Sequence, residues 1–137
     1  MAADRLHIEA TNDIPGIILN PEGFVRVYGR GLMGFNPEMS VKIFGWIEEY
    51  LKSPARITTV IIAMEYLNSF SAKVLVSILK EISRVTEKDR YYFIHWCYEE
   101  EDEDILERGE FIAATLNIPI DFIRTPDITQ SFLSLRI

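Results

Sequence analysis

The sequence predicts a single α/β domain built on a mixed β-sheet, and three observations lead to that prediction. The chain has 137 residues, which is the length of one domain. Two continuously apolar runs, Ile57–Met64 and Tyr91–Cys97, have the composition of buried parallel strands, and each precedes a stretch with helical periodicity. Turn residues at 21–23 separate two shorter apolar runs, which predicts an antiparallel hairpin near the N-terminus.

The first part of the chain reads as strands followed by a helix. Short strands are predicted at Leu6–Ala10, Gly16–Leu19 and Phe24–Tyr28. Asn36-Pro37-Glu38 then has the residues that begin a helix, because Asn caps, Pro suits the first helical position and Glu complements the helix dipole. Ser53-Pro54 ends this helix. Its apolar face is formed by Met39, Ile43, Trp46, Ile47, Tyr50 and Leu51.

Two further helices and a last strand complete the predicted elements. A helix begins near Asn68 after the Ile57–Met64 strand, and its buried stripe is Val74, Leu75, Ile78, Leu79, Ile82 and Val85. The next helix follows the acidic run, and Gly109 on its inner face would allow close approach to the sheet. A strand is expected at Ile118–Ile123, and the tail Asp127–Ile137 is expected to form a short helix.

The order of these elements is β-β-β-α-β-α-β-α-β. Helices between the last four strands imply right-handed crossovers, so the core of the sheet should be parallel, and the early hairpin makes the sheet mixed. The chain shows no linker, internal repeat or low-complexity segment, which supports one domain over residues 1–137.

Composition excludes several classes of partner. The net charge is −7, from 21 acidic and 14 basic residues, which argues against nucleic acid and against an anionic membrane surface. No apolar run reaches the ~18 residues of a membrane-spanning helix, and the N-terminus does not read as a signal peptide. A single cysteine, Cys97, allows no internal disulfide. These features predict a cytoplasmic protein.

The sequence offers little for catalysis. Neither His7 nor His95 belongs to a recognisable nucleophile–base pair, there is no GxSxG motif, and the acidic residues after Cys97 would raise the pKa of its thiol. The glycine-rich residues 29–34 lack the features of a phosphate-binding loop and read as a flexible connection. We therefore expect no enzyme activity and no cofactor.

The acidic run Glu99–Asp104 has two main interpretations. Acidic side chains favour the positive end of a helix dipole, so the run is typical of a solvated helix start. An alternative is that the run faces a basic partner. Metal binding through these carboxylates is a third hypothesis, although the run does not match the calcium-loop pattern.

The joint between the Ile57–Met64 strand and the next helix contains Asn68, Ser69 and Ser71. Asn and Ser are common N-caps, so plain helix capping is one interpretation. Capping needs only one such residue, however. Sites in open α/β sheets collect at the carboxyl ends of central strands, and N–H groups at a helix start attract anions. A phosphate there would gain on the order of 1 kcal/mol from the helix dipole and would change the surface charge sharply.

The segments EYLNSFSAK and WCYEEEDEDILERGE, within a match from about Leu6 to Ile123, resemble the SiaC family of bacterial regulatory phosphoproteins. The resemblance implies a STAS-like fold, similar to that of anti-sigma-factor antagonists. It also implies phosphorylation by a dedicated Ser/Thr kinase and dephosphorylation by a PP2C-type phosphatase. The unphosphorylated form would bind and regulate a GGDEF-type diguanylate cyclase in c-di-GMP signalling.

The position that follows the motif's Asn makes Ser69 the expected phosphoacceptor. Asn68 would shape the turn, Ser71 would cap or hydrogen-bond nearby, and Phe70 and Lys73 are candidates for partner contact. Two alternatives remain open: a STAS-like antagonist of an anti-sigma factor that uses the same serine, and a metal-binding protein that uses the acidic run.

Overall fold

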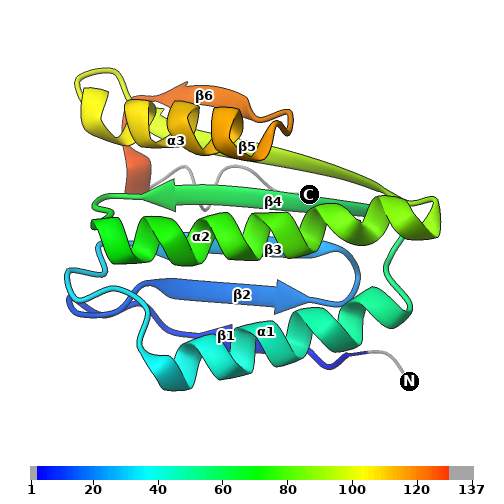
Figure 1. Ribbon diagram of the computed structural model, residues 1–137. Helices are drawn as coiled ribbons and strands as arrows, with labels where there is room; N and C mark the ends of the chain where they lie inside the picture. Colours follow the sequence, from blue (N-terminus) through cyan, green and yellow to red (C-terminus); the bar gives the residue numbers. More distant parts are fainter. Residues whose placement is uncertain (1–2, 130–137) are drawn as a thin grey trace.

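A computed structural model describes residues 3–129 and shows one six-stranded sheet with strand order β1-β2-β3-β4-β5-β6 (Figure 1). The elements in chain order are β1 (Leu6–Ile8), β2 (Gly16–Asn20), β3 (Phe24–Gly29), α1 (Pro37–Lys52), β4 (Ile57–Met64), α2 (Ser69–Ile82), the 3₁₀ helix η1 (Ser83–Lys88), β5 (Tyr91–Glu99), α3 (Glu103–Leu116) and β6 (Asp121–Thr125). The predicted mixed α/β fold and its element order are confirmed.

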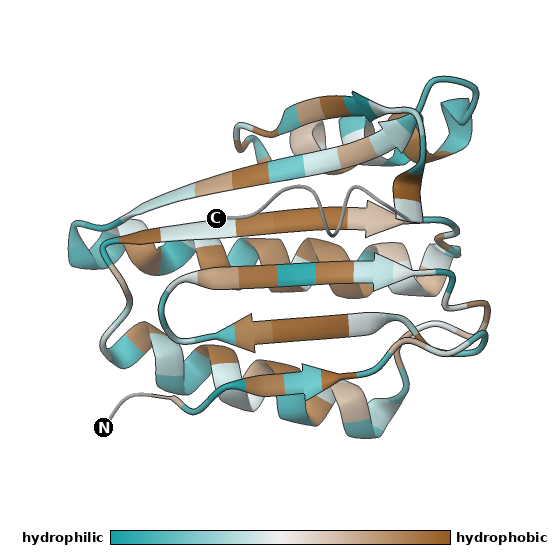
Figure 2. Cartoon of the chain, turned by 180° about the vertical axis from the view of Figure 1, so that it is seen from behind, coloured by the Kyte–Doolittle hydropathy of each residue, from teal (hydrophilic) through white to brown (hydrophobic). Residues whose placement is uncertain are grey.

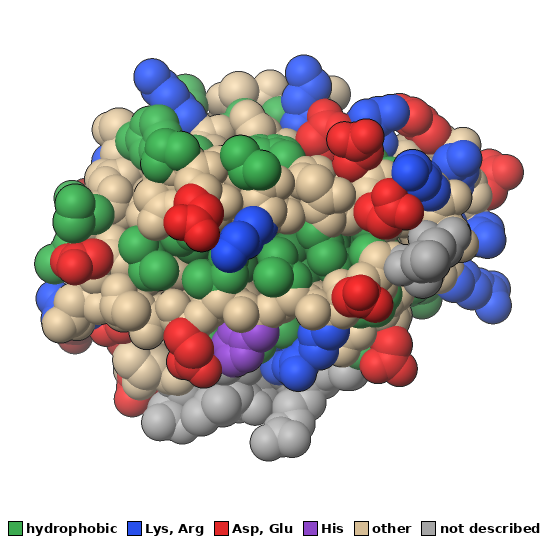
Figure 3. All heavy atoms as spheres, turned by 90° about the horizontal axis from the view of Figure 1, so that it is seen from below, with side chains coloured by type: hydrophobic (Ala, Val, Ile, Leu, Met, Phe, Trp, Pro, Cys, Tyr) green, Lys and Arg blue, Asp and Glu red, His purple; other side chains and the backbone are tan. Residues whose placement is uncertain are grey.

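The N-terminal strands pair antiparallel, as the turn chemistry predicts. β2 and β3 form the expected hairpin, with Ile18 opposite Arg26, and β1 adds to its outer side. β1 is shorter than the predicted Leu6–Ala10, because a turn begins at Thr11, three residues after its end. There the Thr11 hydroxyl accepts hydrogen bonds from the N–H groups of Asp13 and Ile14, at 3.1 and 3.0 Å. Figure 3 shows the molecule from the side of β1 and α1, where a band of hydrophobic side chains runs between scattered charged ones.

Helix α1 begins and ends where its sequence signals predict. The Asn36 side chain caps it by accepting a hydrogen bond from the N–H of Met39 at 2.8 Å, and Pro37 occupies the first helical position. Its buried residues match the predicted face except for Leu51, which is half-buried: Met39, Ile43, Trp46, Ile47 and Tyr50.

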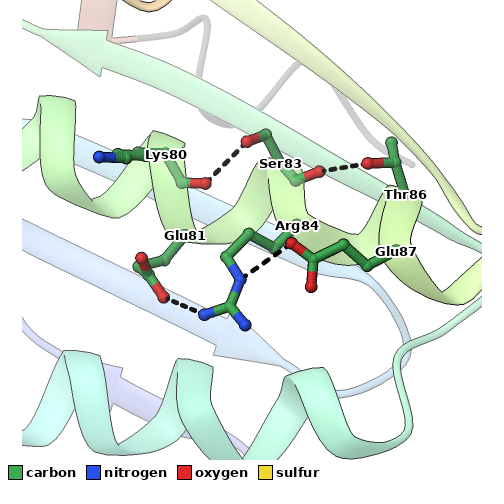
Figure 4. Close-up of polar contacts among 6 residues, drawn as sticks. All are labelled: Lys80, Glu81, Ser83, Arg84, Thr86 and Glu87. Atoms are coloured by element: carbon green, nitrogen blue, oxygen red, sulfur yellow. Dashed lines mark hydrogen bonds and ion pairs between the residues drawn. The ribbon is translucent and has the colours of Figure 1, made fainter.

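Helix α2 continues into the 3₁₀ helix η1, a change that the helical periodicity did not reveal. The Ser83 hydroxyl donates to the carbonyl of Lys80 at 2.7 Å, and Arg84 pairs with Glu81 and Glu87 at 2.9 and 3.3 Å (Figure 4). Val85, predicted as part of the α2 stripe, is buried but belongs to η1. The helical segment therefore still covers the sheet along its whole length.

The C-terminal part differs most from the prediction. The last strand, expected at Ile118–Ile123, forms at Asp121–Thr125 instead. Asn117 adopts a left-handed conformation that ends α3, and Pro119 has no N–H to give to a ladder, so pairing starts later. Most of the predicted tail helix, Asp127–Ile137, lies outside the described residues.

All the helices between strands lie on one face of the sheet, as Figures 1 and 2 show from opposite sides. Because each crossover leads to the next neighbouring strand in the same direction, right-handed crossovers place α1, α2 and α3 on the same face. The main core fills the space between these helices and the sheet. No helix among residues 3–129 is long and apolar enough to cross a membrane.

Candidate functional site

The carboxyl ends of the parallel strands β3, β4 and β5 meet at one edge of the sheet, and three loops lie there. Residues 30–36 lead from β3 into α1, residues 65–68 lead from β4 into α2, and residues 100–102 lead from β5 into α3. The predicted site residues belong to the middle loop and to the first turns of α2. The topology therefore places them between two neighbouring loops.

Asn68 connects two of these loops. Its side-chain oxygen caps α2 by accepting a hydrogen bond from the N–H of Ser71 at 2.7 Å. Its amide nitrogen donates to the carbonyl oxygen of Leu32, in the loop before α1, at 3.3 Å. The turn-shaping role expected of Asn68 is thus accompanied by a link to the glycine-rich loop, which is held in place rather than left as a free connection.

The two serines of the motif have opposite environments. Ser69 is exposed and is the first residue of α2, whereas Ser71 is only 1% exposed. The Ser71 hydroxyl has no hydrogen-bond partner among the described residues, and it lies so close to Gly34 that a Cβ there would be 2.1 Å from it. Its backbone N–H, not its side chain, takes part in capping. Of the two serines, only Ser69 is accessible from the surface.

Exposed apolar side chains lie at the start of α2 and on the loop before α1. Phe70 is 56% exposed, and Leu32 and Met33 of the neighbouring loop are 47% and 73% exposed. Sequence reasoning selected Phe70 but missed Leu32 and Met33. The sequence did contain a signal for these two residues. A glycine-rich loop has little core in which to bury large apolar side chains, so two of them in such a loop indicate an exposed apolar surface.

A groove of about 270 Å³ runs from Ser69 between α2 and α3. Its α2 side carries the exposed Lys73, which was selected from the sequence, together with Ala72 and Val76. Its α3 side carries Arg108, Phe111 and Ile112, which were not selected. Nothing in the local sequence of α3 indicates this proximity, because it depends on how two crossover helices pack side by side.

The acidic run serves the start of α3. Asp102 is the N-cap, and its carboxylate accepts a hydrogen bond from the N–H of Ile105 at 3.1 Å. Glu99 accepts from the N–H of Ile128 at 2.8 Å, and Glu100 lies 3.4 Å from Arg124. In residues 3–129, no three His, Cys, Asp or Glu side chains gather in a way that could hold a metal ion. The contact of Asp102 fits the helix-start interpretation, whereas Glu99 and Glu100 contact β6 and the residues after it.

The histidines and the cysteine lie away from Ser69. His7 contacts the hydroxyl of Tyr28 at 3.2 Å, and His95 lies 3.9 Å from a carboxylate oxygen of Asp121. Cys97 is fully buried. None of these three residues is therefore part of the candidate site.

The carboxyl edge of the sheet carries an exposed serine at a capped helix start, with exposed apolar side chains near it. These features are those of a small α/β domain with a candidate modification site and a candidate binding surface.

Comparisons with known proteins give the family. Residues 8–125 match the SiaC family regulatory phosphoproteins, so the chain belongs to this family. It is accordingly a regulatory protein and not an enzyme. A relative in Pseudomonas aeruginosa (strain UCBPP-PA14), the uncharacterized protein PA14_02130, is 26% identical over 119 residues, which are 83% of this chain and 91% of that protein.

Solved structures agree with the fold. SiaC of Pseudomonas aeruginosa superimposes with a TM-score of 0.74 at 20% identity, covering 89% of this chain and 99% of that one. SiaC in the crystal structure of the diguanylate cyclase SiaD with its activator SiaC, from the same organism, gives a TM-score of 0.73 at 21% identity, over 88% of this chain and 99% of that one. The shared architecture is consistent with the STAS-like fold expected from the sequence.

Proposed function

We propose that this protein is a phosphorylation-controlled switch whose unphosphorylated form binds and regulates a GGDEF-type diguanylate cyclase. The observation that carries the proposal is the contrast between an exposed Ser69 at the first position of α2 and a buried Ser71. Membership of the SiaC family supports it, and so does the complex in which the similar SiaC activates the cyclase SiaD.

A phosphate on Ser69 would be well placed electrostatically. The N–H groups of Ser69 and Phe70 have no hydrogen-bond acceptor among the described residues, and the first turn of α2 has no acidic side chain. Helix N-termini attract anions through such groups, with a gain of about 0.3–1 kcal/mol at an exposed position. The phosphorylated state is therefore compatible with an intact α2.

The same phosphate would oppose docking of a partner. It adds about −1.5 to −2 charges beside Phe70, Leu32 and Met33, whose exposed apolar surface suits a protein contact. Burying that charge in an apolar interface without a partner is costly. Phosphorylation would thus remove the cyclase from this surface.

The proposal implies one enzyme that phosphorylates Ser69 and another that dephosphorylates it. A Ser/Thr kinase would phosphorylate the exposed hydroxyl of Ser69, and a PP2C-type phosphatase would hydrolyse the phosphate ester and restore the hydroxyl. The kinase uses ATP and the cyclase uses GTP, so we place the protein in the cytoplasm, and we expect it to act as one domain over residues 1–137.

The proposal is tested by binding to the diguanylate cyclase of the source organism, measured by calorimetry. Ser69→Glu should weaken binding at least tenfold, about 1.4 kcal/mol, while Ser69→Ala should bind like the wild type. Ser77→Glu is a matched control, because Ser77 is exposed further along the same helix. Equal affinity of the two Ser69 variants would contradict the proposal, and binding to an anti-sigma factor instead of the cyclase would favour the antagonist alternative.

The acceptor is tested separately by incubation with the organism's Ser/Thr kinase and ATP, followed by peptide mapping. One phosphate is expected on Ser69 and none on Ser71, because the Ser71 hydroxyl is buried against Gly34. A phosphate on Ser71 alone would move the acceptor and would require α2 to open at its first turn.

A further inference from the structure

We infer that the groove between α2 and α3 is an internal phosphate-binding site, in which Lys73 and Arg108 receive the phosphate of Ser69. This inference rests on the proposed function, since it assumes that Ser69 is the residue modified. It adds a mechanism: phosphorylation would not only place charge on the surface but would join two helices across a groove that is open in the unmodified protein.

Two stripes of side chains define the groove. One face of α2 contributes residues that lie three or four positions apart from Ser69 or Val76, namely Ala72 and Lys73. On α3, Phe111 and Ile112 lie three and four positions after Arg108, and the three residues form the opposite wall. The side chains of Ser69, Lys73 and Arg108 therefore line a single space of about 270 Å³, whose walls are mostly apolar.

Both cations are available for a new partner. Neither Lys73 nor Arg108 forms an ion pair with an acidic side chain within the described part of the chain, although the protein carries a net charge of −7. Arg84, further along the same helical segment, shows the contrast, because it is paired on both sides (Figure 4). Guanidinium binds phosphate oxygens through two parallel N–H donors, which makes Arg108 suited to this role.

The surroundings give the phosphate a preferred direction. A second hollow adjoins the groove through Arg108, and it is lined by the carboxylates of Glu65, Asp102, Asp104 and Glu107. Like charges repel a phosphate from that side, while the two cations attract it to the other. The modified side chain should therefore turn into the α2–α3 groove.

The backbone of α3 beside Arg108 is held by its neighbour Gly109. Gly109 packs so tightly on the sheet that a Cβ would lie 2.7 Å from the Trp96 ring, so α3 cannot rotate or slide freely beside α2. A phosphate would therefore have to order only the Arg108 side chain and not the helix that carries it. Once seated, the phosphate would cover the apolar surface of Ala72 and Val76 and withdraw it from a partner.

The test uses protein with phosphoserine inserted at position 69 during translation, so it does not depend on any kinase. The second ionisation of the phosphate is followed by ³¹P NMR as a function of pH. A free phosphoserine has a second pKa of about 6. Adjacent cations favour the dianion, so the pKa of the seated phosphate should be lower by about one unit.

Arg108→Gln and Lys73→Gln should each return the phosphate pKa toward that of free phosphoserine, and Arg108→Lys should retain part of the shift. Arg56→Gln and Lys80→Gln are matched controls, because Arg56 lies at the opposite end of β4 and Lys80 lies on α2 outside the groove. A shift that survives in both Arg108→Gln and Lys73→Gln would assign it to the helix N-terminus alone and overturn the inference. A phosphate that titrates like free phosphoserine in the wild type would overturn it as well.

The two proposals fail in different ways. Absence of kinase modification at Ser69, or cyclase binding indifferent to charge at position 69, would contradict the proposed function and leave the NMR result unchanged. An unshifted phosphate would remove the internal receiving site while the switch itself stands. Far-ultraviolet circular dichroism of each variant verifies its fold, and Lys73→Gln gives an independent reading if Arg108→Gln is unfolded.

Discussion

At the scale of single residues, some polar groups of the motif NSFS fix the turn before α2, and another remains exposed. Asn68 uses both ends of its amide, one to cap α2 and one to hold the loop at Leu32. Ser71 gives its backbone N–H to the cap and buries its hydroxyl beside Gly34, which leaves Ser69 as the exposed hydroxyl. The residues that fix the turn are thus distinct from the residue that we propose is modified.

Asn68→Ala should lower the free energy of unfolding by about 1 kcal/mol, the usual cost of a lost N-cap. Asn68→Asp keeps the acceptor for the Ser71 N–H but loses the donor to Leu32, so it isolates the link between the loops. Ser71→Ala should change stability little or raise it slightly, since its hydroxyl has no partner among the described residues. Urea denaturation measures all three, and a large loss with Ser71→Ala would reveal a hydrogen bond to that hydroxyl.

At the scale of elements, the contacts of α3 show where the chain requires glycine. Gly109 faces Trp96 and Phe122, and a Cβ there would lie 2.7 Å and 2.8 Å from their rings. The Trp96 ring is itself held by a hydrogen bond from its Nε1 to the carbonyl of Ile105 at 3.0 Å. The close approach predicted for this helix is therefore confirmed, and the ring cannot yield easily.

Gly109→Ala should destabilise the protein by about 1–3 kcal/mol through overpacking, even though alanine is the better helix former. Gly45→Ala is the control, because Gly45 is an exposed position of α1 where a Cβ would meet nothing within 4 Å. That substitution should stabilise by about 0.5–1 kcal/mol. Thermal unfolding compares the two, and a stabilising Gly109→Ala would mean that α3 stands further from the sheet.

At the scale of the whole molecule, the sheet is covered by helices on one face, and its stability depends on how tightly that layer excludes water. Tyr92 reports on this layer, because its ring packs against the main core at the edge of the helix-covered face. Burial raises the pKa of the Tyr92 hydroxyl above its ordinary value of 10.0. Folding therefore favours the neutral phenol.

The raised pKa of Tyr92 determines how the free energy of unfolding changes with pH. A raised folded-state pKa stabilises the protein fully below the unfolded value of 10.0, and this contribution is lost as the pH rises through the folded pKa. Wild type should thus lose more stability than Tyr92→Phe between about pH 8 and pH 11, measured by urea unfolding. Tyr91→Phe, at an exposed neighbouring position, should follow the wild type. Parallel losses in wild type and Tyr92→Phe would contradict the assignment.

The sequence by itself determined the element order, the start of α1 and α2, and the buried character of β4, because caps and apolar periodicity act over a few residues. It misplaced β6, since Pro119 and the left-handed Asn117 delay pairing after α3. The sequence did not predict the strand order, because an apolar run shows that a strand is buried but not which strands lie beside it. Only the tertiary structure buried Ser71 against Gly34, tied Asn68 to Leu32 and brought Arg108 to the groove of Ser69 and Lys73. Each of these contacts joins residues from different elements, and packing of the crossovers alone decides which of them meet.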